Sequence, residues 1–213
     1  MPVIEYQRLP DVVVVPDVCV GSLRRVRSVV LAVKTPRLED VRRIALDESS
    51  RTSAALLKII FREFLGFDPE WSSSVPDVAQ MLSGNDAALI IGDPGMTFAR
   101  GNLRLFDMAE LWREHTGLGF VFALWMAAER AAERVRKIDF AAARDEGLAR
   151  AEEIVAYYQP LLNLTREELR SYLAENISFS ISEEMRAGMD LYFQLAFKHG
   201  LIPALKPLKT IQP

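Results

Sequence analysis

The first 128 residues alternate between short apolar runs and segments in which apolar residues repeat at helical spacing. The apolar runs are rich in β-branched residues and bounded by Pro, Asp or Gly, which is typical of buried strands. They predict strands at 12–15, 26–33, 43–47, 69–73, 86–92, 103–106 and 119–126. The helical spacing between them predicts helices at 50–65, 76–82 and 108–114.

From about residue 139 the pattern becomes purely helical. Apolar positions predict one helix over 140–158, Thr165 opens a second that runs to about Ala174, and Ser182 opens a third that runs to Lys198. Strands that alternate with helices predict an α/β protein with a mostly parallel sheet, followed here by a helical C-terminal segment.

The turn between the strand at 43–47 and the following helix concentrates polar groups. It reads Ser49-Ser50-Arg51-Thr52-Ser53, four hydroxyls and one arginine. The first backbone N–H groups of a helix lack intrahelical partners and carry partial positive charge, so such a turn suits a carboxylate or phosphate. Ser49 or Ser50 as a simple helix cap is the open alternative. One cap requires one hydroxyl, and the excess favours a ligand site.

Composition narrows the function classes. A net charge of −3 argues against an electrostatic nucleic-acid binder, and the single cysteine, Cys19, forms no internal disulfide and fits a reducing compartment. The longest apolar stretch is interrupted by prolines and charges, and the N-terminus lacks a signal pattern. We therefore expect a cytoplasmic protein without a membrane or nucleic-acid partner. His115 and His199 at predicted helix ends form no metal site.

Six segments spread along the chain carry a resemblance to a known family: Ile4-Glu5-Tyr6-Gln7, residues 16–22, 45–53, 88–94 and 116–123, and Asn176-Ile177-Ser178-Phe179. Together they resemble the menaquinone-biosynthesis chorismate dehydratases of the futalosine pathway. The resemblance implies a type II periplasmic-binding-protein fold, with two α/β lobes around a ligand cleft. Lobe one would hold residues 1–31 and 122–213, and lobe two residues 32–121, with crossing strands at 28–33 and 119–124.

The chain departs from this family at its front. Family members carry several tens of residues before the equivalent of Ile4, including a first strand and a segment that faces the cleft. By this comparison, lobe one is expected to lack its opening strand and one wall of the site. A sheet edge exposed where that strand would lie favours self-association.

The resemblance implies a carbon–oxygen lyase that removes water from chorismate, giving 3-[(1-carboxyvinyl)oxy]benzoate, without cofactor or metal. Backbone N–H groups of Thr52 and Ser53, with the Ser50 and Thr52 hydroxyls, would bind one carboxylate. Arg51 would either pair with that carboxylate or hold the turn.

Other candidates follow strands whose ends would converge on the cleft. Ser22 is the candidate for a second substrate contact, or else a turn serine beside Gly21. Gly92 is a further substrate-binding candidate, and Asp93 is a candidate base or a turn aspartate that binds its own backbone. No side chain is an evident general base, and a carboxylate of the substrate could accept the proton instead.

Three alternatives remain open from the sequence. One is the sister enzyme of the same pathway, which makes dihydroxynaphthoate and has a histidine base where this chain reads Gly92-Asp93. The second is a non-catalytic binding protein for small carboxylates, and the third is an inactive fragment.

Overall fold

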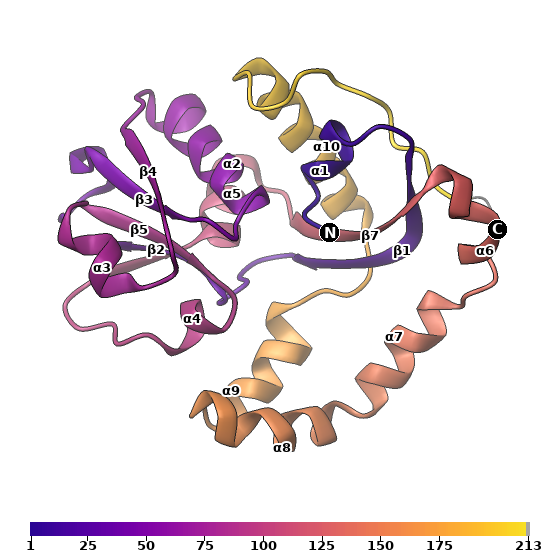
Figure 1. The fold of residues 1–213 in the computed structure, drawn as a ribbon. Coiled ribbons are helices and arrows are strands. Elements are labelled where there is room, and N and C mark those ends of the chain that lie inside the picture. The colour runs from indigo at the N-terminus through magenta and orange to yellow at the C-terminus, as the bar shows by residue number, and fades with distance from the viewer. Residues whose placement is uncertain (212–213) are drawn as a thin grey trace.

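The protein is described here by a computed structural model that covers residues 1–211. Its larger sheet has five strands in the order β4-β3-β5-β2-β6 (Figure 1). β3 runs parallel to β4 and β5, whereas β2 runs antiparallel to β5 and β6. The expectation of a mostly parallel sheet therefore holds for only part of it. These strands are β2 (Val29–Val33), β3 (Arg43–Asp47), β4 (Glu70–Ser74), β5 (Ala87–Ile91) and β6 (Arg104–Asp107).

The helix after β3 ends where its sequence indicates but begins two residues later. α2 starts at Thr52, not at Ser50, and runs to Ile59. It continues as a π-helical segment from Ile60 to Leu65, and Gly66 ends it in the left-handed conformation (φ 78°) that glycine tolerates. The other helices beside the five-stranded sheet are α3 (Val78–Ser83), α4 (Gly92–Thr97) and α5 (Met108–Thr116).

The second sheet consists of β1 (Val12–Ser22) and β7 (Phe120–Ala128), which pair antiparallel. β1 is longer than the predicted strand at 12–15, because the chain passes Pro16 and Asp17 through a break in register between Val14 and Cys19. Asp17 takes a positive φ of 59° there, a local kink that lets pairing resume beyond it. α1 (Glu5–Arg8) precedes this sheet.

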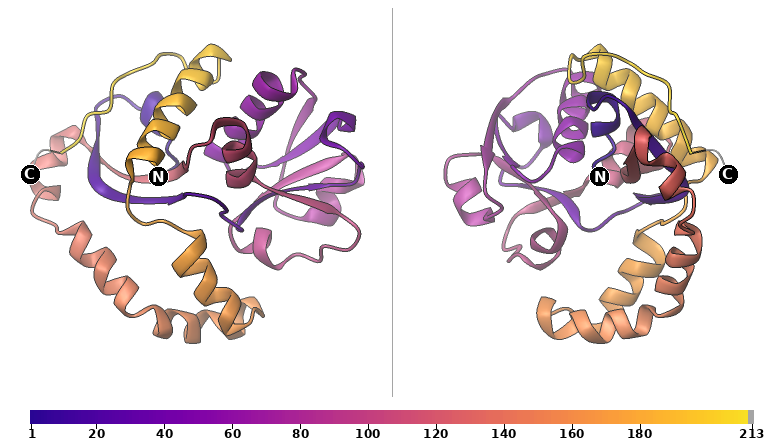
Figure 2. Two further views of the ribbon diagram at one scale, coloured as in Figure 1. Left: turned by 180° about the vertical axis from the view of Figure 1, so that it is seen from behind. Right: turned by 45° about the vertical axis from the view of Figure 1, so that its right-hand side comes forward.

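The C-terminal helices form two groups. α10 (Glu183–Lys198) packs against β7 and α2. The remaining helices lie on the side of β1 and β7 opposite α10 (Figures 1 and 2). The predicted helix at 140–158 is in fact two helices, because the backbone leaves helical geometry at Arg150 (φ −102°, ψ 21°). This group contains α7 (Phe140–Ala149), α8 (Ala151–Leu162), α9 (Arg166–Ser171) and the π-helical η4 (Tyr172–Asn176). α6 (Ala132–Val135) links the group to β7. Two single 3₁₀ turns lie elsewhere, η1 at Leu38–Asp40 and η3 at Glu129–Ala131.

One hydrophobic core joins the two sheets. Trp112 of α5, Phe120 of β7 and Tyr192 of α10 are completely buried and meet edge to face, with the Phe120 ring centroid 5.5 Å from that of Trp112 and 5.1 Å from that of Tyr192. The Tyr192 hydroxyl also donates to the backbone oxygen of Thr52 at the start of α2, so this cluster adjoins the predicted polar turn. Within residues 1–211, no helix is both long and apolar enough to cross a membrane.

Candidate binding pocket

Asp47, the last residue of β3, organises the polar turn. Its Oδ1 accepts hydrogen bonds from the backbone N–H of Ser49 (2.9 Å) and from the Ser49 hydroxyl (2.6 Å). Its backbone oxygen accepts from the Ser50 N–H at 2.9 Å. An Asp that binds the backbone two residues on forms a tight local turn, so the path of the chain into α2 is fixed.

The helix-cap alternative is wrong for both serines. No side chain caps the start of α2, and the Ser49 hydroxyl is engaged with Asp47. The Ser50 side chain is buried, with 8% of the residue exposed, and its Oγ has no hydrogen-bond partner among the described residues. A buried hydroxyl without a partner is costly, and such groups are rare in folded proteins. Ser50 therefore supplies a free donor beside uncapped helix amides.

Thr52 and Ser53 are buried at the first turn of α2. The Thr52 backbone oxygen accepts a hydrogen bond from the Tyr192 hydroxyl (3.0 Å), and its Oγ1 accepts from the Ile4 N–H (3.5 Å). Burial raises the pKa of Tyr192, so its phenol stays protonated as the donor. Contacts from α10 and from the N-terminal segment thus hold the start of the helix rigidly.

Arg51 is engaged with Glu5. Its Nη1 donates to Glu5 Oε2 at 3.1 Å, while Arg8 binds the other Glu5 oxygen at 2.9 Å. The Glu5 carboxylate is buried, whereas 61% of the Arg51 side chain is exposed. This ion pair ties the turn to α1, and pairing of Arg51 with a substrate carboxylate stays a prediction.

A pocket of about 310 Å³ opens at this turn. It brings together five of the predicted site residues: Ser50, Arg51, Thr52, Ser53 and Gly92. The opposite walls are mostly apolar and come from β2, β5, β7 and the N-terminal segment. They consist of Val29, Ile91, Phe122, Ala123, Met1 and Pro2, and Ser49 completes the lining.

Two predicted residues do not line this pocket. Ser22 is buried at the end of β1, and its Oγ accepts from the Arg24 N–H at 3.3 Å, as a turn serine does. Asp93 is exposed in the first turn of α4, where its backbone oxygen accepts from the Thr97 hydroxyl (2.8 Å). Catalysis by Asp93 and binding by Ser22 stay predictions.

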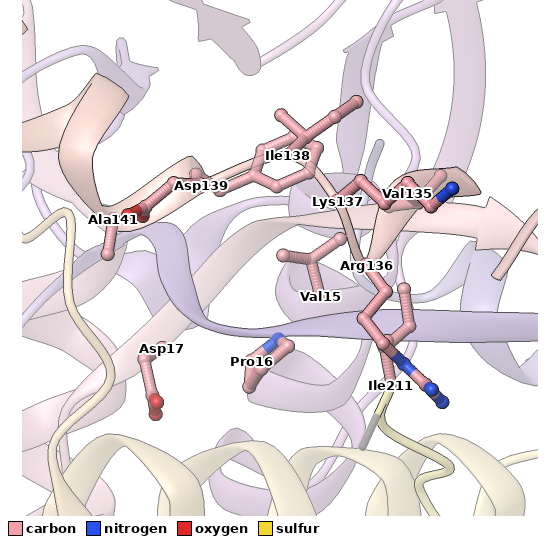
Figure 3. Close-up of a pocket in the computed structure, with 11 residues that line it drawn as sticks. Val15, Pro16, Asp17, Val135, Arg136, Lys137, Ile138, Asp139, Ala141 and Ile211 are labelled. Carbon is pink, nitrogen blue, oxygen red and sulfur yellow. The ribbon is translucent and has the colours of Figure 1, made fainter. Parts of the chain in front are cut away.

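Neither histidine lies among the residues that line the pocket. His115 stacks on Phe64 with ring centroids 4.6 Å apart, and His199 Nε2 lies 2.8 Å from Glu63 Oε2. A slightly larger pocket, about 350 Å³, lies between the kinked part of β1 and residues 135–141, and it contains none of the predicted site residues (Figure 3). Residues 1–211 contain no group of three or more His, Cys, Asp or Glu able to hold a metal ion.

Sequence reasoning missed two residues that shape the pocket. Asp47 had a visible signal, because a carboxylate that follows a buried strand and precedes two serines is typical of a turn that binds its own backbone. Phe122 had no such signal, because its apolar neighbours in β7 look alike in sequence and only the packing decides which one faces the pocket.

Comparison with known proteins agrees with this picture. A family described as menaquinone biosynthesis matches residues 1–198. Among curated proteins, the chorismate dehydratase of Thermus thermophilus is 30% identical over 195 residues, which cover 83% of this chain and 70% of that protein.

Solved structures share the fold at low sequence identity. A protein of Archaeoglobus fulgidus superposes with a TM-score of 0.65 at 19% identity, covering 95% of this chain and 78% of that one. An alkanesulfonate-binding protein of Xanthomonas axonopodis, bound to MOPS, gives 0.62 at 15% identity, covering 95% and 73%. A Candida albicans protein described as having the generic periplasmic binding protein fold gives 0.58 at 9% identity, covering 99% and 78%. The expected fold class is therefore confirmed, and the chain belongs to the menaquinone biosynthesis family and is a homologue of chorismate dehydratase.

Proposed function

We propose that this protein is a chorismate dehydratase, a hydro-lyase that forms 3-[(1-carboxyvinyl)oxy]benzoate for menaquinone synthesis by the futalosine route. The observation that carries the proposal is Ser50, which lines a pocket at the uncapped start of α2 and whose buried hydroxyl has no hydrogen-bond partner among residues 1–211. The homologous Thermus protein supports the choice of reaction.

The pocket suits a carboxylate attached to a ring. In the proposal, one substrate carboxylate accepts from Ser50 Oγ and from the first amides of α2, which carry the positive end of the helix dipole. Val29, Ile91 and Phe122 provide an apolar wall for the ring. An anion site is consistent with the fold, since one structural neighbour is an alkanesulfonate-binding protein.

The reaction breaks one C–H bond and one C–O bond. The ring loses a proton, the electron pair completes the aromatic system, and the hydroxyl leaves with a proton as water. Because the pocket is lined by anion-binding groups and has no free titratable base, we propose that a carboxylate of the substrate takes the ring proton. The enzyme then acts mainly by orienting the substrate.

We propose that the chain forms two lobes, residues 1–31 with 122–213 and residues 32–121, and that this pocket lies where they meet. The larger sheet uses strands within 29–107, and the smaller sheet uses strands on either side of that range. Ile91 from residues 32–121 and Phe122 from residues 122–213 share the pocket, which supports a ligand site between the lobes.

The direct test is incubation of the purified chain with chorismate, followed by mass spectrometry for a product lighter by one water. The proposal expects product above a buffer blank, and loss of most of it in Ser50→Ala. The Asp93→Asn and Glu5→Gln variants test the base, because a fall of several orders of magnitude in kcat would assign the proton to an enzyme carboxylate. No product from a folded chain that still binds benzoate would support a small-carboxylate binding protein instead.

A further inference from the structure

We propose that Asp47 is a positioning residue that holds the two walls of the pocket in register. This inference rests on the proposed function only in its choice of ligand. It concerns the carboxylate of the last residue of β3, which does not itself line the pocket.

The two oxygens of Asp47 reach two different strands. Oδ1 accepts both bonds from Ser49, which set the polar turn, and Oδ2 accepts from the backbone N–H of Ile91 at 3.3 Å. Ile91 ends β5, and Gly92 follows it with a positive φ of 67°. Ser49 and Ser50 line the pocket from the turn after β3, and Ile91 and Gly92 line it from the end of β5. One carboxylate therefore joins the two segments.

The burial and the charge of Asp47 indicate that it positions other groups and does not bind the anion itself. Asp47 is 1% exposed and makes no ion pair within residues 1–211. A negative charge this close to an anion pocket weakens anion binding by simple electrostatics. A carboxylate nevertheless provides two oxygens that accept several donors at once, which no neutral side chain of the same size does. Its hydrogen bonds set the position of Ser50, although its negative charge weakens anion binding in the pocket.

These two effects predict opposite results for Asp47→Asn. The amide keeps the size and removes the charge, so electrostatics alone predicts tighter anion binding. The amide nitrogen, however, cannot accept a hydrogen bond, so the variant loses the contact either to Ser49 or to Ile91. Positioning therefore predicts weaker binding.

Asp107 offers a matched control. It is also a buried aspartate at the end of a strand, 4% exposed, and its oxygens accept from the backbone N–H groups of Val26, Arg27, Ala109 and Glu110 at 2.6–3.2 Å. It does not line the pocket. Arg25 Nε also lies 3.8 Å from Asp107 Oδ2, an ion pair that has no counterpart at Asp47 within the described residues. Asp107→Asn therefore has at least a comparable structural cost without touching the proposed binding geometry.

The experiment measures the Kd of benzoate by calorimetry, the thermal midpoint, and KM and kcat for chorismate. We expect at least a tenfold rise in Kd and KM for Asp47→Asn, with kcat changed less than threefold. Asp107→Asn is expected to lower the thermal midpoint with Kd within twofold of wild type. Unchanged or tighter benzoate binding by Asp47→Asn would overturn the inference.

A second variant and a comparison of benzoate binding with chorismate turnover complete the test. Should Asp47→Asn fail to fold, Ser49→Ala removes only the hydroxyl bond to Oδ1, and a rise of about threefold in Kd is expected; an unchanged Kd overturns the inference. Wild-type protein that binds benzoate but does not convert chorismate overturns the proposed reaction, while a weakened Asp47→Asn still supports the positioning role. Wild-type protein that does not bind benzoate overturns both.

Discussion

At the scale of single residues, the Ser50 hydroxyl separates function from stability. Ser50→Ala removes a buried polar atom that makes no bond within the described chain, so no protein hydrogen bond is lost. We expect the free energy of unfolding, from urea titration, to stay level or rise by up to about 1 kcal/mol, since an unpaired buried hydroxyl is unfavourable. KM for chorismate is expected to rise at least tenfold.

Ser182→Ala is the control, and it is expected to lower stability without changing KM. Ser182 caps α10, where its Oγ accepts from the Met185 N–H at 3.2 Å. Loss of such a cap costs about 1 kcal/mol, and Ser182 lies outside the pocket, so KM should not change. If Ser50→Ala instead destabilised the chain and left KM unchanged, Ser50 would be an ordinary structural residue.

At the scale of elements, two glycines in helices test how α10 is held. A Cβ at Gly188 would lie 2.0 Å from the backbone oxygen of Gly119, so α10 must move away from the segment that enters β7. We expect Gly188→Ala to lower the free energy of unfolding by about 3 kcal/mol or more, because backbone cannot yield as a side chain can.

Gly147 in α7 is the matched position, since a Cβ there meets nothing within 4 Å. Gly147→Ala is expected to stabilise by up to about 1 kcal/mol through helix propensity. Denaturant titration of both variants checks the pair, and equal effects would contradict the close packing of α10.

The helices and strands also show which parts of the fold could be predicted from the sequence. The run from β3 through the polar turn into α2 was predictable, because a buried strand, clustered hydroxyls and helical spacing follow each other without a gap. The antiparallel direction of β2 was not, since its five residues are all buried and a two-sided apolar strand reads the same in either direction. The break at Arg150 was missed because the apolar spacing continues through it.

In the candidate site, too, some features could be predicted from the sequence and others could not. Local sequence identified Ser50 and Thr52, since both belong to one turn. The contacts that hold the turn, from Glu5 and Tyr192, join residues 46 and 140 positions apart. Such pairs depend on how the two sheets pack, and no local pattern encodes them.

At the scale of the whole molecule, Cys19 predicts how stability depends on alkaline pH. It lies in β1, where its N–H donates to the Phe179 oxygen and its Sγ lies 3.5 Å from the Ser178 oxygen, so it belongs to the contact between β1 and the segment before α10. Burial raises the pKa of this thiol from 9.0 to about 12, against a smaller opposing effect of Arg144.

The direction in which stability changes with pH depends on whether the thiol ionises first in the folded or in the unfolded state. Above pH 9 the thiol ionises in the unfolded chain but remains protonated in the folded one, so the unfolded state binds fewer protons and stability falls as pH rises. The slope approaches about 1.4 kcal/mol per pH unit between pH 9 and 12. Tyr172 and Tyr192, whose pKa values are also raised by burial from 10.0, contribute only above pH 10.

Urea titrations of wild type and Cys19→Ala at pH 8, 9 and 10 isolate this thiol, the only one in the chain. The variant is expected to be less stable at pH 8, because a buried side chain has been shortened, yet to lose less stability than wild type between pH 9 and 10. Lysines and tyrosines titrate alike in both proteins, so the difference between the two slopes belongs to Cys19. Equal slopes would show that the thiol ionises freely in the folded state, and that the segment at Ser178 and Phe179 does not exclude water from β1.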